Sequence, residues 1–208
     1  MEQKPPDYFR FGDPKGSEGR EALESMNSHH KELSEWAMSL LPSIDPDSIL
    51  DVGCGGGMQL NMLGSKFPKA YLTGVDFSED AVTFASETNK IKIEAGMCRI
   101  DQAPAEELPY SNVTFDLVSA FETYFFWSDL DLAFSEVYRV LKPKGILMVI
   151  SEQYPDPKFK KRNDEACMRT GMKLIHNDEL LSILKNAGFS TEYTTLPEKN
   201  WVCFIAKK

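Results

Sequence analysis

Residues 49–57 read Ile-Leu-Asp-Val-Gly-Cys-Gly-Gly-Gly, an apolar run that ends in glycines. A helix-like pattern follows from Met58. An apolar strand, a glycine turn and a helix start are typical of the opening of a ligand site in an α/β sheet. Glycine adopts backbone angles that other residues resist, and it lets a ligand approach bare backbone. Because the free N–H groups of a first helical turn favour anions, the stretch predicts that a small molecule binds here.

The rest of the chain alternates short apolar runs with helical patterns. This alternation predicts an α/β fold with a doubly wound, mostly parallel sheet and helices on both faces. Residues 1–47 are expected to form an extended arm and a lid helix, and residues 48–208 the main domain. The expected strands are 48–53, 71–76, 98–102, 115–121, 146–151, 191–195 and 201–206. The expected helices are 20–41, 58–67, 79–89 with Ser78 as N-cap, 131–141, and one capped by Asn177 that ends at Ala187, with 152–172 as a polar insertion.

Composition excludes several classes of partner. The 208 residues are 42% hydrophobic and carry a net charge of −9. An acidic chain argues against binding to nucleic acid or to an anionic membrane, because both need a basic face. The one basic cluster, residues 158–162, is followed by Asp164 and Glu165, so a solvated loop is favoured over a binding patch. We expect a monomer or a homodimer.

Cysteine usage indicates the compartment. Cys54, Cys98, Cys167 and Cys203 show no spacing typical of disulfides or metal sites, and the chain has only three histidines. The sequence therefore predicts a reduced, cytoplasmic protein without a metal site. We expect no signal peptide, and the sequence shows no apolar run long enough to cross a bilayer.

The predicted helix 20–41 has a polar interruption on its apolar face. Leu23, Leu33 and Ala37 belong to the apolar stripe, whereas Asn27 and His30 are polar. A buried polar side chain costs about 1–3 kcal/mol unless it is paired, so this position requires an explanation. A satisfied core histidine and a catalytic base facing a substrate both explain His30.

The glycines do not match the dinucleotide fingerprint. Counted from Gly53, the third glycine of G-x-G-x-x-G would stand at position 58, which is Met58. The next acidic residue at a strand end is Asp76, and a carboxylate there can accept hydrogen bonds from two ribose hydroxyls. That role is shared by several nucleoside cofactors, so Asp76 alone does not choose among them.

Further segments in register carry a family resemblance. They read DVGCGGG at 51–57, GVDFS at 74–78, LPY at 108–110, TFDLV at 114–118 and EVYRVLKPKG at 136–145. Together they resemble the class I S-adenosylmethionine-dependent methyltransferases, in particular the small-molecule type 11 methyltransferases. The resemblance implies a Rossmann-like seven-stranded sheet with an antiparallel last strand, and S-adenosylmethionine as cofactor. Residues 48–208 would then form the cofactor-binding domain.

The resemblance also implies roles for the residues of these motifs. Gly53 and Gly55 would let backbone approach the methionine moiety and the ribose. Asp51 would orient the loop or meet the amino group of the cofactor. Asp76 would bind the ribose hydroxyls, with a helix cap on the surface as the alternative. Phe77 would cover one face of the adenine, with plain core packing as the alternative.

One position departs from the family pattern. Related enzymes often carry an aspartate four residues before the Leu-Pro-aromatic motif, where this chain has Pro104. Adenine is therefore expected to be held by the backbone N–H of Ala105 and by Glu106. Asp101 is the less favoured carboxylate, because strand alternation could turn it away.

The methyl acceptor is expected beyond the carboxyl ends of the strands, where α/β sheets bind ligands. Residues 121–127 read Phe-Glu-Thr-Tyr-Phe-Phe-Trp and follow the fourth predicted strand. We place Phe121 at the cofactor, Glu122 beside the reacting sulfonium, and Tyr124 and Trp127 at an apolar or planar acceptor. The alternative for the aromatic rings is packing of a lid, and for Glu122 it is a structural hydrogen bond. Asn27 and His30 would contact the acceptor from the N-terminal helix, with His30 and Glu122 as candidate catalytic residues.

These observations favour a methyltransferase that acts on a small molecule. Methyl transfer from a sulfonium needs alignment and exclusion of water rather than a covalent nucleophile, so no Ser/His/Asp arrangement is required. A cofactor-binding relative without catalysis would also fit an intact glycine loop with Asp76. A nicotinamide-dependent oxidoreductase is disfavoured by Met58.

Overall fold

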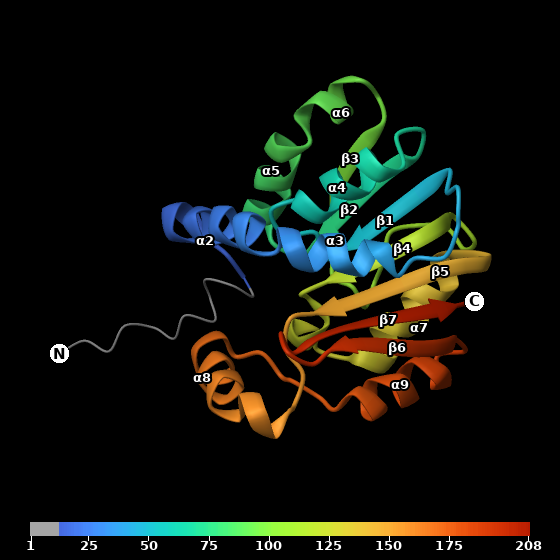
Figure 1. The fold of residues 1–208 in the computed structure, drawn as a ribbon. Helices are drawn as coiled ribbons and strands as arrows, with labels where there is room; N and C mark the ends of the chain where they lie inside the picture. The colour runs from blue at the N-terminus through green and yellow to red at the C-terminus, as the bar shows by residue number, and fades with distance from the viewer. Residues whose placement is uncertain (1–12) are drawn as a thin grey trace.

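The computed structural model describes residues 13–208, except for the side chains of Met26 and Ser28. Most of the expected N-terminal arm, residues 1–12, lies outside the described residues. Figure 1 shows one sheet with helices on both faces. The strands are β1 (Ser48–Val52), β2 (Tyr71–Asp76), β3 (Cys98–Gln102), β4 (Phe115–Phe121), β5 (Leu141–Ser151), β6 (Ser190–Leu196) and β7 (Trp201–Lys207). The helices are α2 (Gly16–His29), α3 (Lys31–Ser39), α4 (Met58–Lys66), α5 (Glu79–Thr88), α6 (Lys90–Glu94), α7 (Leu130–Val140), α8 (Lys160–Thr170) and α9 (Asn177–Asn186), with 3₁₀ turns at Tyr124–Phe126 and Pro157–Phe159.

The strand order places a ligand site at the centre of the sheet. The order is β3-β2-β1-β4-β5-β7-β6, and β7 pairs antiparallel with both β5 and β6. The chain reverses its direction of travel through the sheet between β1 and β4. Such a switch point opens a crevice outside the carboxyl strand ends. The predicted α/β fold with seven strands and an antiparallel last strand is confirmed.

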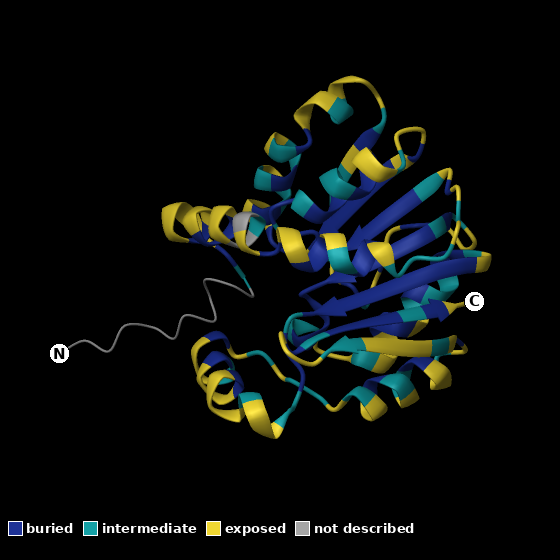
Figure 2. Cartoon of the chain, viewed as in Figure 1, coloured by how far each residue is buried: buried dark blue, intermediate teal, exposed yellow. Residues whose placement is uncertain are grey.

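Two apolar layers form where side chains alternate across the strands. Ile49 and Leu50 are both buried but belong to opposite layers, and Leu117 and Val118 on β4 repeat this alternation. One layer packs under α3 and α4, and the other under α7 and α9. Figure 2 shows the buried strands between helices whose outer faces are exposed. Because both faces are covered, the central strands read as continuous apolar runs rather than as alternating ones.

The N-terminal helix is divided, which corrects the prediction of one helix over 20–41. α2 ends at His29 and α3 begins at Lys31, with His30 at the junction. The residues on the two sides pack differently: α2 contacts α5, whereas Leu33 and Ala37 of α3 enter the sheet core. Because of this break, the apolar residues of α2 and of α3 pack against different partners, α5 and the sheet core.

Three further predictions needed correction. The insertion at 152–172 contains α8, which ends at Gly171 in a left-handed conformation (φ 74°). The basic cluster at 158–162 therefore forms a 3₁₀ turn and the start of α8 rather than a loop. The N-cap of α9 is His176, not Asn177. Ser78 is confirmed as the cap of α5, because its hydroxyl accepts the N–H of Ala81.

Candidate functional site

A cavity of about 310 Å³ lies beyond the carboxyl ends of the central strands. We call it the cofactor cavity. Its walls come from the glycine loop, the ends of β2 and β4, the loop after β3, and α2. Its lining includes nearly every predicted site residue: Asn27, His30, Asp51, Gly53, Gly55, Asp76, Phe77, Ala105, Glu106, Phe121, Glu122 and Trp127. Tyr124 is the exception.

The glycine loop is held in place from both sides. Gly53 has a φ of 68°, and a Cβ added there would stand 2.0 Å from the hydroxyl oxygen of Thr123. The N–H groups of Gly53 and Cys54 both donate to the carbonyl of Val75. The Asn27 amide donates to the Gly56 carbonyl at 3.1 Å, so α2 is tied directly to the loop. Side chains at Gly53 and Gly56 would therefore collide with Thr123 and Asn27.

Asp51 offers a free carboxylate oxygen to the cavity. It is buried at the end of β1, and its Oδ1 accepts a short hydrogen bond from the Ser119 hydroxyl. Its Oδ2 is buried without a partner among the described residues. Burial raises the pKa of Asp51 to about 7; the Ser119 bond opposes this shift and the Asp76 charge adds to it. A cationic ligand group beside Oδ2 would satisfy this oxygen.

Asp76 is buried at the end of β2 and organises the loop around it. Its Oδ2 accepts the N–H of Gly55 at 2.9 Å, and its Oδ1 accepts the N–H of Ser78 at 3.0 Å. Burial raises its pKa, and these backbone hydrogen bonds oppose the shift. Each carboxylate oxygen can accept more than one bond, so both keep capacity for ligand hydroxyls.

A half-exposed aromatic and a polar loop form the outer edge of the cavity. Phe77 is 49% exposed, so it is not a core residue. Ala105 is buried in the opposite wall. Oε1 of Glu106 accepts the N–H groups of Ser128 and Asp129. That oxygen therefore already has partners, which leaves Oε2 as the atom of Glu106 available to a ligand.

The aromatic run after β4 divides between cavity and core. Phe121 lines the cavity and meets the His30 ring edge-on at a centroid distance of 5.5 Å. Trp127 lines the cavity and packs on Phe134. Tyr124 is only 1% exposed and is packed in the core against Phe125. Tyr124 therefore does not line this cavity, and its contact with the acceptor stays a prediction.

Buried polar groups gather at the inner end of the cavity. Glu122 has a φ of 54°, a left-handed conformation that non-glycine residues rarely adopt and that occurs often at functional sites. Its Oε1 accepts the N–H of Glu152, which follows β5. Burial raises the pKa of Glu122 well above its usual range, and the nearby Glu152 charge adds to the shift.

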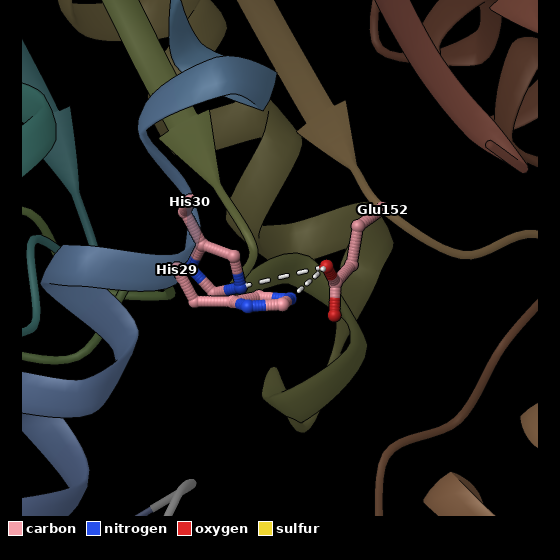
Figure 3. Close-up of side chains that lie close together, drawn as sticks. All are labelled: His29, His30 and Glu152. Carbon is pink, nitrogen blue, oxygen red and sulfur yellow. Dashed lines mark ion pairs between the residues drawn. The ribbon is translucent and has the colours of Figure 1, made fainter.

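Two histidines from the α2–α3 junction meet Glu152 (Figure 3). Oε2 of Glu152 lies 3.4 Å from Nε2 of His29 and 3.7 Å from Nε2 of His30. Burial raises the pKa of Glu152, but its interactions with both imidazoles outweigh burial and leave the pKa below its ordinary value. His30 is thus paired rather than a lone polar group in a core.

Two residues of the site, Gln59 and Glu152, were missed from the sequence, and so was the contact of Thr123 with the glycine loop. Gln59 lines the cavity, and both polar atoms of its amide are buried without partners among the described residues. No sequence signal marks it, because it stands next to the apolar face of α4. Thr123 lies against Gly53, which only the folded loop reveals. Glu152 could have been found, since it directly follows a strand at the same sheet edge.

Comparisons with known proteins show which family this chain resembles. A family model described as a methyltransferase domain matches residues 50–149. Cycloartenol-C-24-methyltransferase 1 of Oryza sativa subsp. japonica is 31% identical over 81% of this chain and 50% of its own length. The methyltransferase YdaC of Bacillus subtilis is 26% identical over 88% of this chain and 95% of its own.

A solved structure shares the fold. Geranyl diphosphate C-methyltransferase from Streptomyces coelicolor, in complex with Mg²⁺, geranyl diphosphate and S-adenosylhomocysteine, has a TM-score of 0.74 at 18% identity. The alignment covers 98% of this chain and 88% of that one.

The fold, the glycine loop and these matches define a class I S-adenosylmethionine-dependent methyltransferase. Within that class, residues 50–149 match the type 11 methyltransferase domain, and the methyl donor is S-adenosylmethionine. Curated relatives include methyltransferases named for cycloartenol, for sterols and for fatty acids. The chain spans about half the length of several of the curated relatives it matches. Among residues 13–208, no helix has the length and hydropathy needed to cross a membrane.

Proposed function

We propose that this protein transfers the methyl group of S-adenosylmethionine to a small-molecule acceptor. The observation that carries the proposal is the buried carboxylate of Asp51, a residue that lines the cofactor cavity and whose Oδ2 has no partner among the described residues. An unpaired polar atom costs about 1–3 kcal/mol when it is buried, and the cofactor ammonium group would satisfy it.

The residues present fit the remaining parts of the cofactor. Asp76 would accept the ribose hydroxyls, and Gly53 and Gly55 would let the backbone approach. Phe77 would cover the adenine, and the N–H of Ala105 with Oε2 of Glu106 would meet its edge. Phe121 would pack near the sulfonium. When bound, the cofactor supplies an electrophilic methyl group on a positively charged sulfur.

The acceptor would lie at the inner end of the cavity, where the polar groups gather. His30 and Glu122 line both this cavity and a second one of about 250 Å³, so they are the proposed catalytic residues. Asn27 and Trp127 line the cofactor cavity and would bound the acceptor. The side chains of this region align the acceptor with the methyl group and keep water out.

Calorimetry with S-adenosylhomocysteine and with NAD tests the cofactor assignment. We expect S-adenosylhomocysteine to bind and NAD to give no heat; binding of NAD alone would overturn the proposal.

A second measurement separates an enzyme from a cofactor-binding relative without catalysis. Radiolabelled S-adenosylmethionine incubated with pooled small-molecule extracts should yield a labelled product, and binding without any turnover would favour the second class.

Charge and thiols support the proposed setting of the protein. The net charge of −9 supports a small-molecule acceptor rather than a nucleic acid or an anionic membrane. All four cysteines are free thiols, which supports a reducing, cytoplasmic location. We propose a monomer or a homodimer, which sedimentation would distinguish.

A further inference from the structure

His29, His30 and Glu152 form a compact cluster of metal-ligating groups from two separate elements. The ligand atoms of the three side chains lie within 4.8 Å of one another. Figure 3 shows both imidazoles directed at the same carboxylate oxygen. The chain break between α2 and α3 makes this possible, because it lets adjacent histidines converge instead of diverging by about 100° on a helix.

The spacing of these atoms is close to that of a coordination sphere. Zinc binds imidazole nitrogen and carboxylate oxygen at about 2.0–2.2 Å, which separates tetrahedral ligands by about 3.4 Å. The distances from Oε2 of Glu152 to the two Nε2 atoms, 3.4 Å and 3.7 Å, lie near this value. Two histidines with one carboxylate are also a known ligand set for catalytic zinc and for other divalent transition metals.

Burial gives the cluster a fixed frame. His30 is buried by α2, α3 and Phe121, and the Glu152 backbone N–H is fixed by the carboxylate of Glu122. The carboxylates of Glu122 and Glu152 lie close together beside the two histidines, partly shielded from solvent. A divalent cation would offset the repulsion between them. His29 is exposed and stands at the entrance, where an ion could arrive from solvent.

We propose that His29, His30 and Glu152 bind one divalent transition-metal ion, with zinc as the reference ion. The site lies at the wall of the second cavity, and His30 also lines the cofactor cavity. Three protein ligands leave an open position for a further ligand. This step rests on the proposed function: the open position suits a methyl acceptor with a coordinating oxygen or sulfur atom. With the ion bound, His30 serves as a ligand and not as a proton acceptor.

Calorimetric titration of Zn²⁺ into the full chain, free of any polyhistidine tag and stripped with chelator, tests the site. We expect one ion per chain with a micromolar or lower Kd. His29→Gln and Glu152→Gln should each weaken binding at least tenfold. His29 is exposed, so its replacement leaves the fold intact. His176→Gln and Glu35→Gln are the matched controls on other surfaces, and they should bind Zn²⁺ like the original chain.

Spectroscopy with Co²⁺ excludes binding by the four thiols. The proposed nitrogen and oxygen ligands should give visible ligand-field bands without an intense thiolate-to-cobalt band near the ultraviolet. A thiolate band, no binding, or equal affinity in the His29→Gln variant would overturn the metal site. S-adenosylhomocysteine binding is measured on the same metal-free samples, so failure of the metal site and failure of the methyltransferase proposal are seen separately.

Discussion

At the scale of single residues, two aspartates at neighbouring strand ends have different surroundings. Asp76 uses its oxygens to accept backbone N–H groups, whereas Asp51 keeps one oxygen without a partner among the described residues. The first arrangement holds a loop in shape, and the second leaves a charge site for a ligand. Asp76 was identified from its strand-end position and Asp51 from the family resemblance, but only the structure separates the two arrangements.

Replacing Asp76 should weaken cofactor binding strongly. Asp76→Ala removes a carboxylate that would bind two ribose hydroxyls and that already positions Gly55. We expect the Kd of S-adenosylhomocysteine to rise by more than about tenfold in calorimetry, since hydrogen bonds to charged groups contribute about 1.5–3 kcal/mol.

The control is another paired carboxylate distant from the cavity. Asp116→Ala removes contacts with Lys142 and Ser48 at the opposite end of the strands. It should lower stability and leave the Kd unchanged. If the two variants bind S-adenosylhomocysteine with the same affinity, the ribose does not bind at Asp76.

The raised pKa of Asp51 predicts that cofactor binding depends on pH. In the free protein this pKa is about 7, so the group is mostly protonated at pH 6 and mostly ionised at pH 8. A cationic ligand prefers the ionised form. The affinity for S-adenosylhomocysteine should therefore rise about tenfold from pH 6 to pH 8. Binding near pH 6.5 should release protons from Asp51.

Calorimetry in two buffers of different ionisation enthalpy measures that proton release. The Asp51→Asn variant cannot titrate at this position and should bind with an affinity that no longer follows this pH profile. An unchanged profile in that variant would assign the pH dependence to another group.

At the scale of elements, the glycine loop and the divided N-terminal helix form the cavity together. Thr123, after β4, fills the space beside Gly53, and Asn27 of α2 holds the Gly56 carbonyl. The loop is therefore fixed by residues that precede it and follow it in the sequence rather than by its own residues alone.

A side chain at Gly53 should disrupt this arrangement. Gly53→Ala carries the strain of a positive φ, about 1–2 kcal/mol, and also a clash with Thr123. Gly96→Ala is the matched control, because Gly96 has a φ of 70° with open space around it. In urea unfolding, Gly53→Ala should lose clearly more stability, and it alone should lose cofactor affinity. Equal losses in the two variants would contradict the steric explanation.

The elements that could be predicted are those with strong local signals. The apolar runs ending at Asp51, Asp76 and Phe121 indicated the strands of the site, because buried parallel strands need continuous apolar sequence. The break at His30 could not be predicted, since the apolar stripe continues on both sides of it. Helix α8 was missed because its sequence, 160–170, is too polar to show a periodic face, and the residues that anchor it, such as Asn200, lie far along the chain.

At the scale of the whole molecule, the residues that stabilise the seven-stranded sheet and the residues that form the site lie in different places. Two packed layers enclose the strands, and the polar groups of the site occupy only their carboxyl ends. The site residues in the motifs could be predicted because they follow strands directly. The convergence of His29, His30 and Glu152 could not, since it depends on how close the α2–α3 junction lies to the residue that follows β5.

Cofactor binding should stabilise the whole chain. A ligand that binds only the folded state at 100 times its Kd adds about 2.7 kcal/mol to the free energy of unfolding. For a chain of 208 residues this corresponds to a rise in Tm of about 5–11 °C. Differential scanning fluorimetry with S-adenosylhomocysteine should show this rise and NAD should show none. A flat response to both would mean that the cavity binds neither.

Helix α2 contributes Leu23 and Asn27 to the cofactor cavity and Ser25 and His29 to the second cavity. A molecule in the second cavity would therefore lie beside α2, the helix whose Asn27 is hydrogen-bonded to the glycine loop. A donor that fixes the glycine loop also fixes α2 over the second cavity, so we expect the methyl donor to bind first and its demethylated product to leave last. In steady-state kinetics with an acceptor, S-adenosylhomocysteine should compete with the donor and inhibit noncompetitively against the acceptor. Competition with both substrates would indicate random entry.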